Sequence, residues 1–173
     1  MRSTTFLATL LAALLATLLP TAILAAPSSL MARAGDEQCA PTSYTLSDYT
    51  LVTSSSQAYV NFNFKSTFAD STIIQDAVTG GANCQADGPT IPNSNECGVE
   101  GRKLLFDLRG PEEQAYYQIT HTWTCNGATW MSGNAVQVDP LNCNESDGTH
   151  TCSGGPQTFA PQNVRKICST PTC

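Results

Sequence analysis

Positive charge is scarce in this chain of 173 residues. It has eight lysine and arginine residues against fourteen aspartate and glutamate residues, and its formal net charge is −6. An acidic chain is repelled by a phosphate backbone and by an anionic membrane surface. The composition therefore argues against nucleic acid and against a membrane surface as partners.

The sequence also lacks the short motifs that mark common catalytic and metal sites. It has no G-x-S-x-G nucleophile elbow, no H-E-x-x-H zinc motif and no C-x-x-C pair. Gly154-Gly155 runs into Pro156 with no helical pattern behind it, so no helix N-terminus is expected there to bind a phosphate. We accordingly predict no catalytic residue, no cofactor and no metal ligand, and expect that the protein is not an enzyme.

A long apolar run occurs only at the N-terminus. Arg2 precedes the apolar residues 6–19, and the small residues Ala25-Ala26 follow them. This order is typical of a secretory signal peptide, predicted over residues 1–26. The alternative is a transmembrane anchor, but Pro20 and the alanine-rich end favour cleavage. Residues 27–38 have no periodicity and are expected to form a flexible arm. The mature protein is predicted to be secreted and extracellular, in association with the cell wall or free, and not in a membrane.

All eight cysteines follow this segment: Cys39, Cys84, Cys97, Cys125, Cys143, Cys152, Cys168 and Cys173. An even number of cysteines in an exported chain predicts four disulfides. Two pairs are local, because Cys84 and Cys97 flank a loop rich in Pro, Asn and Gly, and Cys143 and Cys152 flank a polar loop. The pairing of the other four stays open at this point.

Alternation of apolar and polar side chains dominates the remaining sequence. It is clearest in residues 58–66, where Val60, Phe62 and Phe64 share one face, and in residues 116–125, where His121 and Trp123 share a face with apolar neighbours. Further strands are predicted at 44–52, 103–109, 135–138 and 164–168. Asn126-Gly127 indicates a hairpin between the strand that ends at residue 125 and residues 129–131.

Two segments fit no single pattern. Residues 71–78 are ambiguous between a short helix and a strand, and residues 112–114 could form one helical turn, although Pro111 favours a loop. Many short strands with frequent turns predict an all-β fold: a small antiparallel β-barrel or sandwich with little helix, stapled by disulfides. We place this single domain at residues 39–173.

Strand order and cysteine spacing together resemble a known family. Cys39 precedes the strand at 44–49, the strand at 60–64 follows, Gly98 comes directly after Cys97, and the Cys143–Cys152 pair comes last. This layout resembles the small secreted β-barrel proteins of fungi whose best-known member is the major allergen of Alternaria. The resemblance implies a compact β-barrel, and a non-enzymatic allergen, elicitor or effector that contributes to virulence by binding a plant host protein.

The chain departs from that family in having three additional cysteines, Cys125, Cys168 and Cys173. In some members the early cysteine joins two chains, whereas Cys39 has partners available within this chain. We therefore expect a monomer or a weak homodimer. We also expect Cys39 and Cys125 to pair with the two C-terminal cysteines, in an order that the sequence leaves open.

Three aromatic residues are predicted to anchor a partner on the surface: Tyr59, Tyr116 and Trp130. The alternative is that they only cover the edges of the barrel. A second alternative for function is a small apolar ligand carried in the barrel interior or in a dimer cleft.

A ribonuclease-like hydrolase is the remaining alternative. It would use His121, His150, Arg109 and either Glu100 or Glu113 as acid, base and phosphate ligand. A structural role for His121, hydrogen-bonded beside Trp123, is favoured instead.

One modification site is indicated by the sequence. Asn144-Glu145-Ser146 is a sequon for N-glycosylation, and we predict Asn144 as its acceptor.

Overall fold

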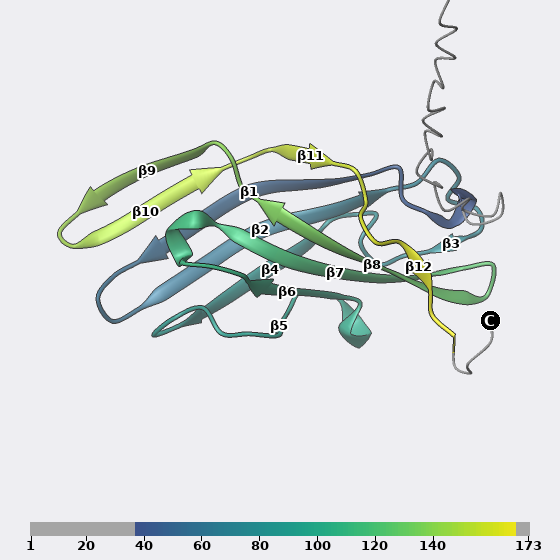
Figure 1. The fold of residues 1–173 in the computed structure, drawn as a ribbon, viewed down its shortest axis with the longest axis horizontal. Helices are drawn as coiled ribbons and strands as arrows, with labels where there is room; N and C mark the ends of the chain where they lie inside the picture. Colours follow the sequence, from purple (N-terminus) through teal and green to yellow (C-terminus); the bar gives the residue numbers. More distant parts are fainter. Residues whose placement is uncertain (1–36, 169–173) are drawn as a thin grey trace, which may run out of the picture. The chain divides into compact units, whose positions relative to one another are not determined.

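Strands make up most of the computed structural model, which describes residues 37–168, and all of them belong to one compact unit, residues 32–173. Within the described residues they form two antiparallel sheets of six strands each (Figure 1). Sheet A contains β1 (Ser43–Thr53), β2 (Ala58–Thr67), β4 (Ala82–Gly88), β9 (Leu141–Ser146), β10 (Thr149–Gly154) and β11 (Gln157–Phe159). Sheet B contains β3 (Ile74–Gln75), β5 (Asn95–Glu96), β6 (Leu104–Leu108), β7 (Tyr116–Cys125), β8 (Ala128–Gln137) and β12 (Arg165–Lys166).

Helix is confined to three short 3-10 turns in the described part of the chain: η1 (Glu37–Cys39), η2 (Glu100–Arg102) and η3 (Glu112–Gln114). None of the described helices is long and apolar enough to cross a membrane. The predicted all-β class with little helix is confirmed.

Strand β1 organises sheet A. It pairs with β2 along its length, and its other edge is shared, because Tyr49 to Thr53 pair with β10 and Tyr44 to Leu46 pair with β11. A bulge between Ser47 and Thr50, with Asp48 at a φ of 55°, separates the two halves. A bulge bends and twists its strand. The bulge therefore allows one half of β1 to pair with β10 and the other half to pair with β11.

The two sheets enclose an aromatic core. The largest buried side chains come from both sheets, and the Phe62 and Phe106 rings lie 5.0 Å apart at their centroids across the interface. The hydroxyls of Tyr49 and Tyr117 meet at 2.9 Å. Each aromatic side chain removes roughly 150–250 Å² from water when it is buried. These rings therefore supply much of the hydrophobic stabilisation.

Several assignments differ from the sequence-based expectation. The region between Cys143 and Cys152 is a β-hairpin, β9–β10, and not a loop. Strand β4 is not predicted, and β8 runs unbroken from Ala128 to Gln137, where two separate segments are expected. Residues 112–114 form a 3-10 turn instead of a loop. Strand β9 is exposed on both faces, so pairing with β10 forms it without apolar alternation.

The described residues contain three disulfides with both partners placed. Cys84–Cys97 and Cys143–Cys152 are present, in agreement with their local spacing. The expectation that Cys39 and Cys125 pair with the C-terminal cysteines is wrong, because they pair with each other. The turn η1 places Cys39 against the end of β7, where its carbonyl accepts a hydrogen bond of 2.8 Å from Trp123 Nε1.

Several predictions fall outside the described residues. Cys168 is disulfide-bonded, and Cys173 lies beyond the described part. The predicted signal peptide and most of the predicted arm also lie outside it, and residues 37 and 38 of that arm belong to η1.

Candidate functional site

The outer face of sheet A carries rows of uncharged polar side chains. Residues that are paired across neighbouring strands of a sheet point to the same face. One row across β4, β2, β1, β10 and β9 reads Asp87, Tyr59, Val52, Thr151 and Asn144. The next row reads Gln85, Asn61, Thr50, Ser153 and Asn142. Of these residues only Asp87 is charged, so this face contrasts with the acidity of the whole chain.

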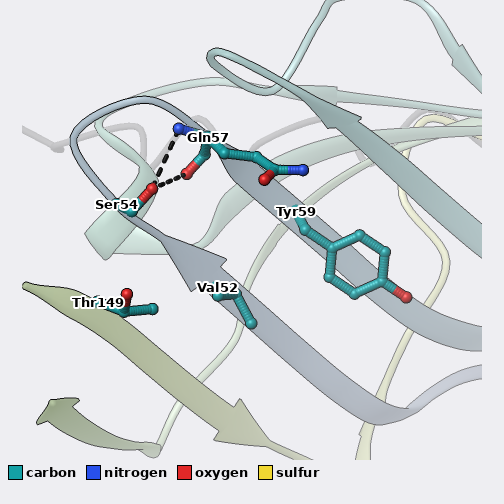
Figure 2. Close-up of a pocket in the computed structure, with 5 residues that line it drawn as sticks. All are labelled: Val52, Ser54, Gln57, Tyr59 and Thr149. Atoms are coloured by element: carbon teal, nitrogen blue, oxygen red, sulfur yellow. Dashed lines mark hydrogen bonds between the residues drawn. The ribbon is translucent and has the colours of Figure 1, made fainter. Parts of the chain in front are cut away.

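A hollow of about 300 Å³ lies on this face at the turn between β1 and β2. We call it the Tyr59 hollow; its lining residues are Val52, Ser54, Gln57, Tyr59 and Thr149 (Figure 2). Two hydrogen bonds close the turn: Ser54 Oγ donates to the Gln57 carbonyl at 3.2 Å and accepts from the Gln57 N–H at 3.1 Å. Tyr59 is half-buried, so part of its side chain is open to solvent. The hollow thus combines the apolar surfaces of Tyr59 and Val52 with the hydroxyl and amide groups of its other lining residues.

A second hollow, of about 380 Å³, adjoins the first. We call it the Asn144 hollow; it is lined by Asn144, Glu145, Ser146, Thr149 and Thr151. Thr149 lines both hollows, and it pairs with Ser146 while Thr151 pairs with Asn144. The β1–β2 turn and the β9–β10 hairpin therefore build one recessed strip on the outer face of sheet A.

The three predicted surface anchors do not form one surface. Tyr59 lines the hollow on sheet A, whereas Tyr116 begins β7 of sheet B and is 36% exposed. Trp130 is wrong as a surface anchor, because only 5% of it is exposed. It packs with Trp123 and the Cys39–Cys125 disulfide in a second small core, together with the partly buried Phe68.

The residues that surround Tyr59 in its hollow are not predicted from the sequence. Thr149 and Ser54 lie about a hundred positions apart and meet only because β10 pairs with β1. The outward positions of residues 58–66 are the one local signal, and they identify Tyr59 but not its neighbours.

A buried hydrogen-bond network connects the two sheets around His121. Tyr44 Oη lies 2.9 Å from His121 Nδ1 and 2.7 Å from Ser132 Oγ, and His121 Nε2 lies 2.9 Å from Asp76 Oδ1. The side chains of His121 and Asp76 are fully buried. With the Nε2–H tautomer, each donor finds an acceptor: Asn134 donates to Ser132, Ser132 to Tyr44, Tyr44 to His121, and His121 to Asp76. The favoured structural role of His121 agrees with this geometry.

Burial and hydrogen bonds shift the ionisation of groups in the core. Burial opposes the ionisation of Asp76, but hydrogen bonds from His121, Ser66 and the Val78 N–H outweigh it and hold the pKa of Asp76 below its usual value. Burial, the largest cause, raises the pKa of Tyr44 well above that of a free phenol. It also raises the pKa of Tyr117 to about 12. The folded state thus favours the protonated phenols of Tyr44 and Tyr117 and the ionised carboxylate of Asp76.

The residues of the ribonuclease-like alternative are not assembled into a site. His121 is buried between the sheets, whereas His150 is exposed on β10, with its Nε2 3.5 Å from Glu145. Arg109 is exposed and lies 3.7 Å from Asp107. Glu100 and Glu113 belong to separate turns, η2 and η3. Each candidate has a different partner or position, so the geometry does not favour this alternative.

The space between the sheets is occupied by side chains that contact one another. Ring centroids lie 4.9 Å apart for Tyr44 and Phe64, and 6.0 Å apart for Tyr49 and Tyr117. This packing does not favour an apolar ligand in the interior. Among the described residues, no group of three or more His, Cys, Asp or Glu side chains is placed to hold a metal ion.

Comparisons with known proteins give a likeness of fold. No protein-family model and no curated protein matches the chain. Two crystal structures of Alt a 1, the major allergen of Alternaria alternata, are similar, each with a TM-score of 0.49 and 11% sequence identity. The first match covers 74% of this chain and 96% of that chain, and the second covers 75% and 92%.

Proposed function

We propose that this chain is an exported, non-catalytic protein that binds another protein through the outer face of sheet A. The observation that carries the proposal is the Tyr59 hollow, whose lining residues carry no formal charge and include the half-buried Tyr59 and Val52. The cores of protein interfaces are depleted of charge and enriched in tyrosine. A tyrosine also has only two side-chain torsions, so it loses little entropy when a partner covers it.

The placement of the ionisable groups supports binding over catalysis. The His121–Asp76 pair has the residue types of a general base, but both side chains are fully buried and saturated with partners. The Tyr59 hollow itself is lined by no ionisable group other than the tyrosine. A general base must reach the proton that it abstracts, and these residues do not offer one at the surface.

Export and an extracellular location, free or at the cell wall, belong to the same proposal. The N-terminal segment has the order of a signal peptide, and the described residues hold three placed disulfides. A secreted fungal protein of this kind would meet plant proteins outside the cell. We therefore propose a plant extracellular protein as the partner and an effector or elicitor as the role.

The proposal can be tested with plant extracellular fluid and three proteins: the wild type, Tyr59→Ala and Tyr116→Ala. We expect a partner that is retained by the wild type and by Tyr116→Ala but lost with Tyr59→Ala. With the purified partner, truncation of the anchor should weaken Kd by about 30-fold, equivalent to about 2 kcal/mol. If Tyr116→Ala alone loses the partner, the binding face lies on sheet B at the start of β7 and the proposal is wrong.

A further inference from the structure

We propose that an N-linked glycan on Asn144 lies across the Asn144 hollow and the Tyr59 hollow and covers the Tyr59 ring. Asn144 is exposed on β9, and its side-chain amide makes no hydrogen bond to any residue that the structure describes. Both Asn144 and Ser146, the two residues that a sequon requires, line the Asn144 hollow. A glycan attached here starts at the Asn144 hollow, on the edge strand of sheet A.

The attachment reaction is the one that the secretory pathway carries out on sequons. The amide nitrogen of Asn144 loses a proton and bonds to C1 of the first sugar, while the diphosphate-linked lipid carrier of the oligosaccharide leaves. This donor is supplied during export, so the chain needs no chemistry of its own.

The register of sheet A sets the path from the attachment point to Tyr59. Asn144 pairs with Thr151, Thr151 with the neighbouring residue Val52, and Val52 with Tyr59. Three steps between neighbouring strands span about 14 Å. A single sugar does not cover that distance, but the branched core of an N-glycan does.

The lining of this path suits a neutral saccharide. Hydroxyl groups of Thr149 and Thr151 and the amide of Gln57 offer donors and acceptors to sugar hydroxyls. Val52 and the Tyr59 ring offer apolar surface to the C–H face of a pyranose. Glu145 is the only lining residue of the two hollows that is charged, so a neutral core glycan meets little unsatisfied charge.

The consequence for regulation rests on the proposed function. If the partner binds at Tyr59, a glycan that covers the ring competes with it, and the unglycosylated form binds more tightly. The covering of Tyr59, however, can be measured without any partner.

The test compares the chain secreted from a glycosylating fungal host with its Asn144→Gln and Ser146→Ala variants, with glycan occupancy confirmed by mass. Each is treated with tetranitromethane, and nitration of each tyrosine is followed by peptide mass spectrometry. We expect Tyr59 to be nitrated at least five-fold more slowly in the glycosylated protein, and both variants to remove the protection. Tyr116, which is exposed on sheet B, is the internal control and should react equally in all samples.

A fourth sample tests whether the first sugar alone is enough to protect Tyr59. An endoglycosidase that trims the glycan to its first sugar should restore nitration of Tyr59, because one sugar on Asn144 does not reach across three strands. An unoccupied sequon in the secreted chain would overturn the proposal. Equal nitration of Tyr59 with and without the glycan would overturn it as well, since the glycan would then project into solvent.

The covering of Tyr59 by the glycan and the binding of a partner at Tyr59 can each be contradicted without the other. Protection of Tyr59 without any Tyr59-dependent partner would support the covering and contradict the proposed function. A Tyr59-dependent partner that binds the glycosylated protein and the Asn144→Gln variant equally well would support the function and contradict the regulation.

Discussion

The hydroxyl of Tyr44 on β1 lies 2.9 Å from Nδ1 of His121 on β7, and this contact ties sheet A to sheet B inside the core. His121 in turn contacts Asp76 at 2.9 Å. A buried network that is fully satisfied specifies one arrangement of its surroundings, whereas a broken one is costly. The alignment of the two sheets therefore depends on polar groups as well as on aromatic packing.

Loss of His121 should destabilise the fold strongly. In the variant His121→Leu, the buried Asp76 carboxylate loses the N–H donor of His121, and leaving a buried charged group short of a hydrogen-bond partner costs about 3 kcal/mol. Tyr44→Phe removes only a neutral hydrogen-bonding group, and should cost about 1–2 kcal/mol. Guanidinium unfolding measures both free energies. An exposed control, Tyr116→Phe, should stay within about 0.5 kcal/mol of the wild type. A His121→Leu protein as stable as that control would contradict the network.

Acid should weaken the fold through Asp76. Because the folded-state pKa of Asp76 lies below its usual value, the ionised form is favoured by folding. Its stabilisation is complete above the unfolded pKa of about 3.9 and is lost as the pH falls through the lower folded value. Denaturant titrations between pH 2 and pH 6 should show this loss in the wild type.

Two variants isolate the source of that acid dependence. Asp76→Asn should be less stable near neutral pH but should lose less stability on acidification. Asp70 also has a lowered pKa, caused by hydrogen bonds from Thr72, but it is fully exposed. Asp70→Asn should therefore leave the acid dependence nearly unchanged. An Asp76→Asn protein with the wild-type acid slope would show that other carboxylates cause it.

Alkali should weaken the fold through the tyrosine pair of the core. Tyr49 and Tyr117 share a hydrogen bond of 2.9 Å, and burial raises both pKa values, that of Tyr117 to about 12. The folded state thus favours the protonated phenols. Their contribution is complete below pH 10 and is lost as the pH rises from about 10 towards 12. Circular dichroism across pH 8–12 should show this loss, and Tyr117→Phe should reduce it. If Tyr116→Phe has the same effect, the pair is not responsible.

The sequence predicts the parts of this fold in which burial is one-sided. Val60, Phe62 and Phe64 alternate with polar neighbours, and all three are fully buried. The β9–β10 hairpin escapes prediction because β9 has no buried face and is joined to the sheet only by its pairing with β10 and by the Cys143–Cys152 disulfide. The candidate site also depends on pairing between strands that are distant in the sequence. Tyr59 is visible as an outward aromatic, but Thr149 reaches it only through pairing between β1 and β10, which no local pattern encodes.

The contact between Asp76 and His121 cannot be predicted from the sequence for a related reason. Asp76 lies at the end of an ambiguous segment, directly after the two-residue strand β3. Its distance of 45 positions from His121 is bridged only in the folded chain. Trp130 is misassigned because alternation does not distinguish a residue at the open surface from one that a second small core covers.

The long-range disulfide should contribute more to stability than the hairpin disulfide. Cys39–Cys125 closes 86 positions of sequence, whereas Cys143–Cys152 closes nine. In the chain-entropy model, these loops correspond to about 4.6 and about 2.6 kcal/mol at 25 °C. Double alanine variants of each pair, compared by guanidinium unfolding, should reproduce that order.

The burial of the cysteines also predicts a larger contribution to stability from Cys39–Cys125 than from Cys143–Cys152. Both cysteines of the long-range pair are buried beside Trp123 and Trp130, so their replacement by alanine also removes packing from the second core. In the hairpin pair, Cys143 is exposed, and the β9–β10 ladder holds the strands together after the bond is removed. The hairpin variant should therefore keep the far-ultraviolet spectrum of the wild type at 25 °C, with a midpoint at lower denaturant. A larger loss of stability in the hairpin variant would mean that β9–β10 is held by its disulfide and not by its pairing.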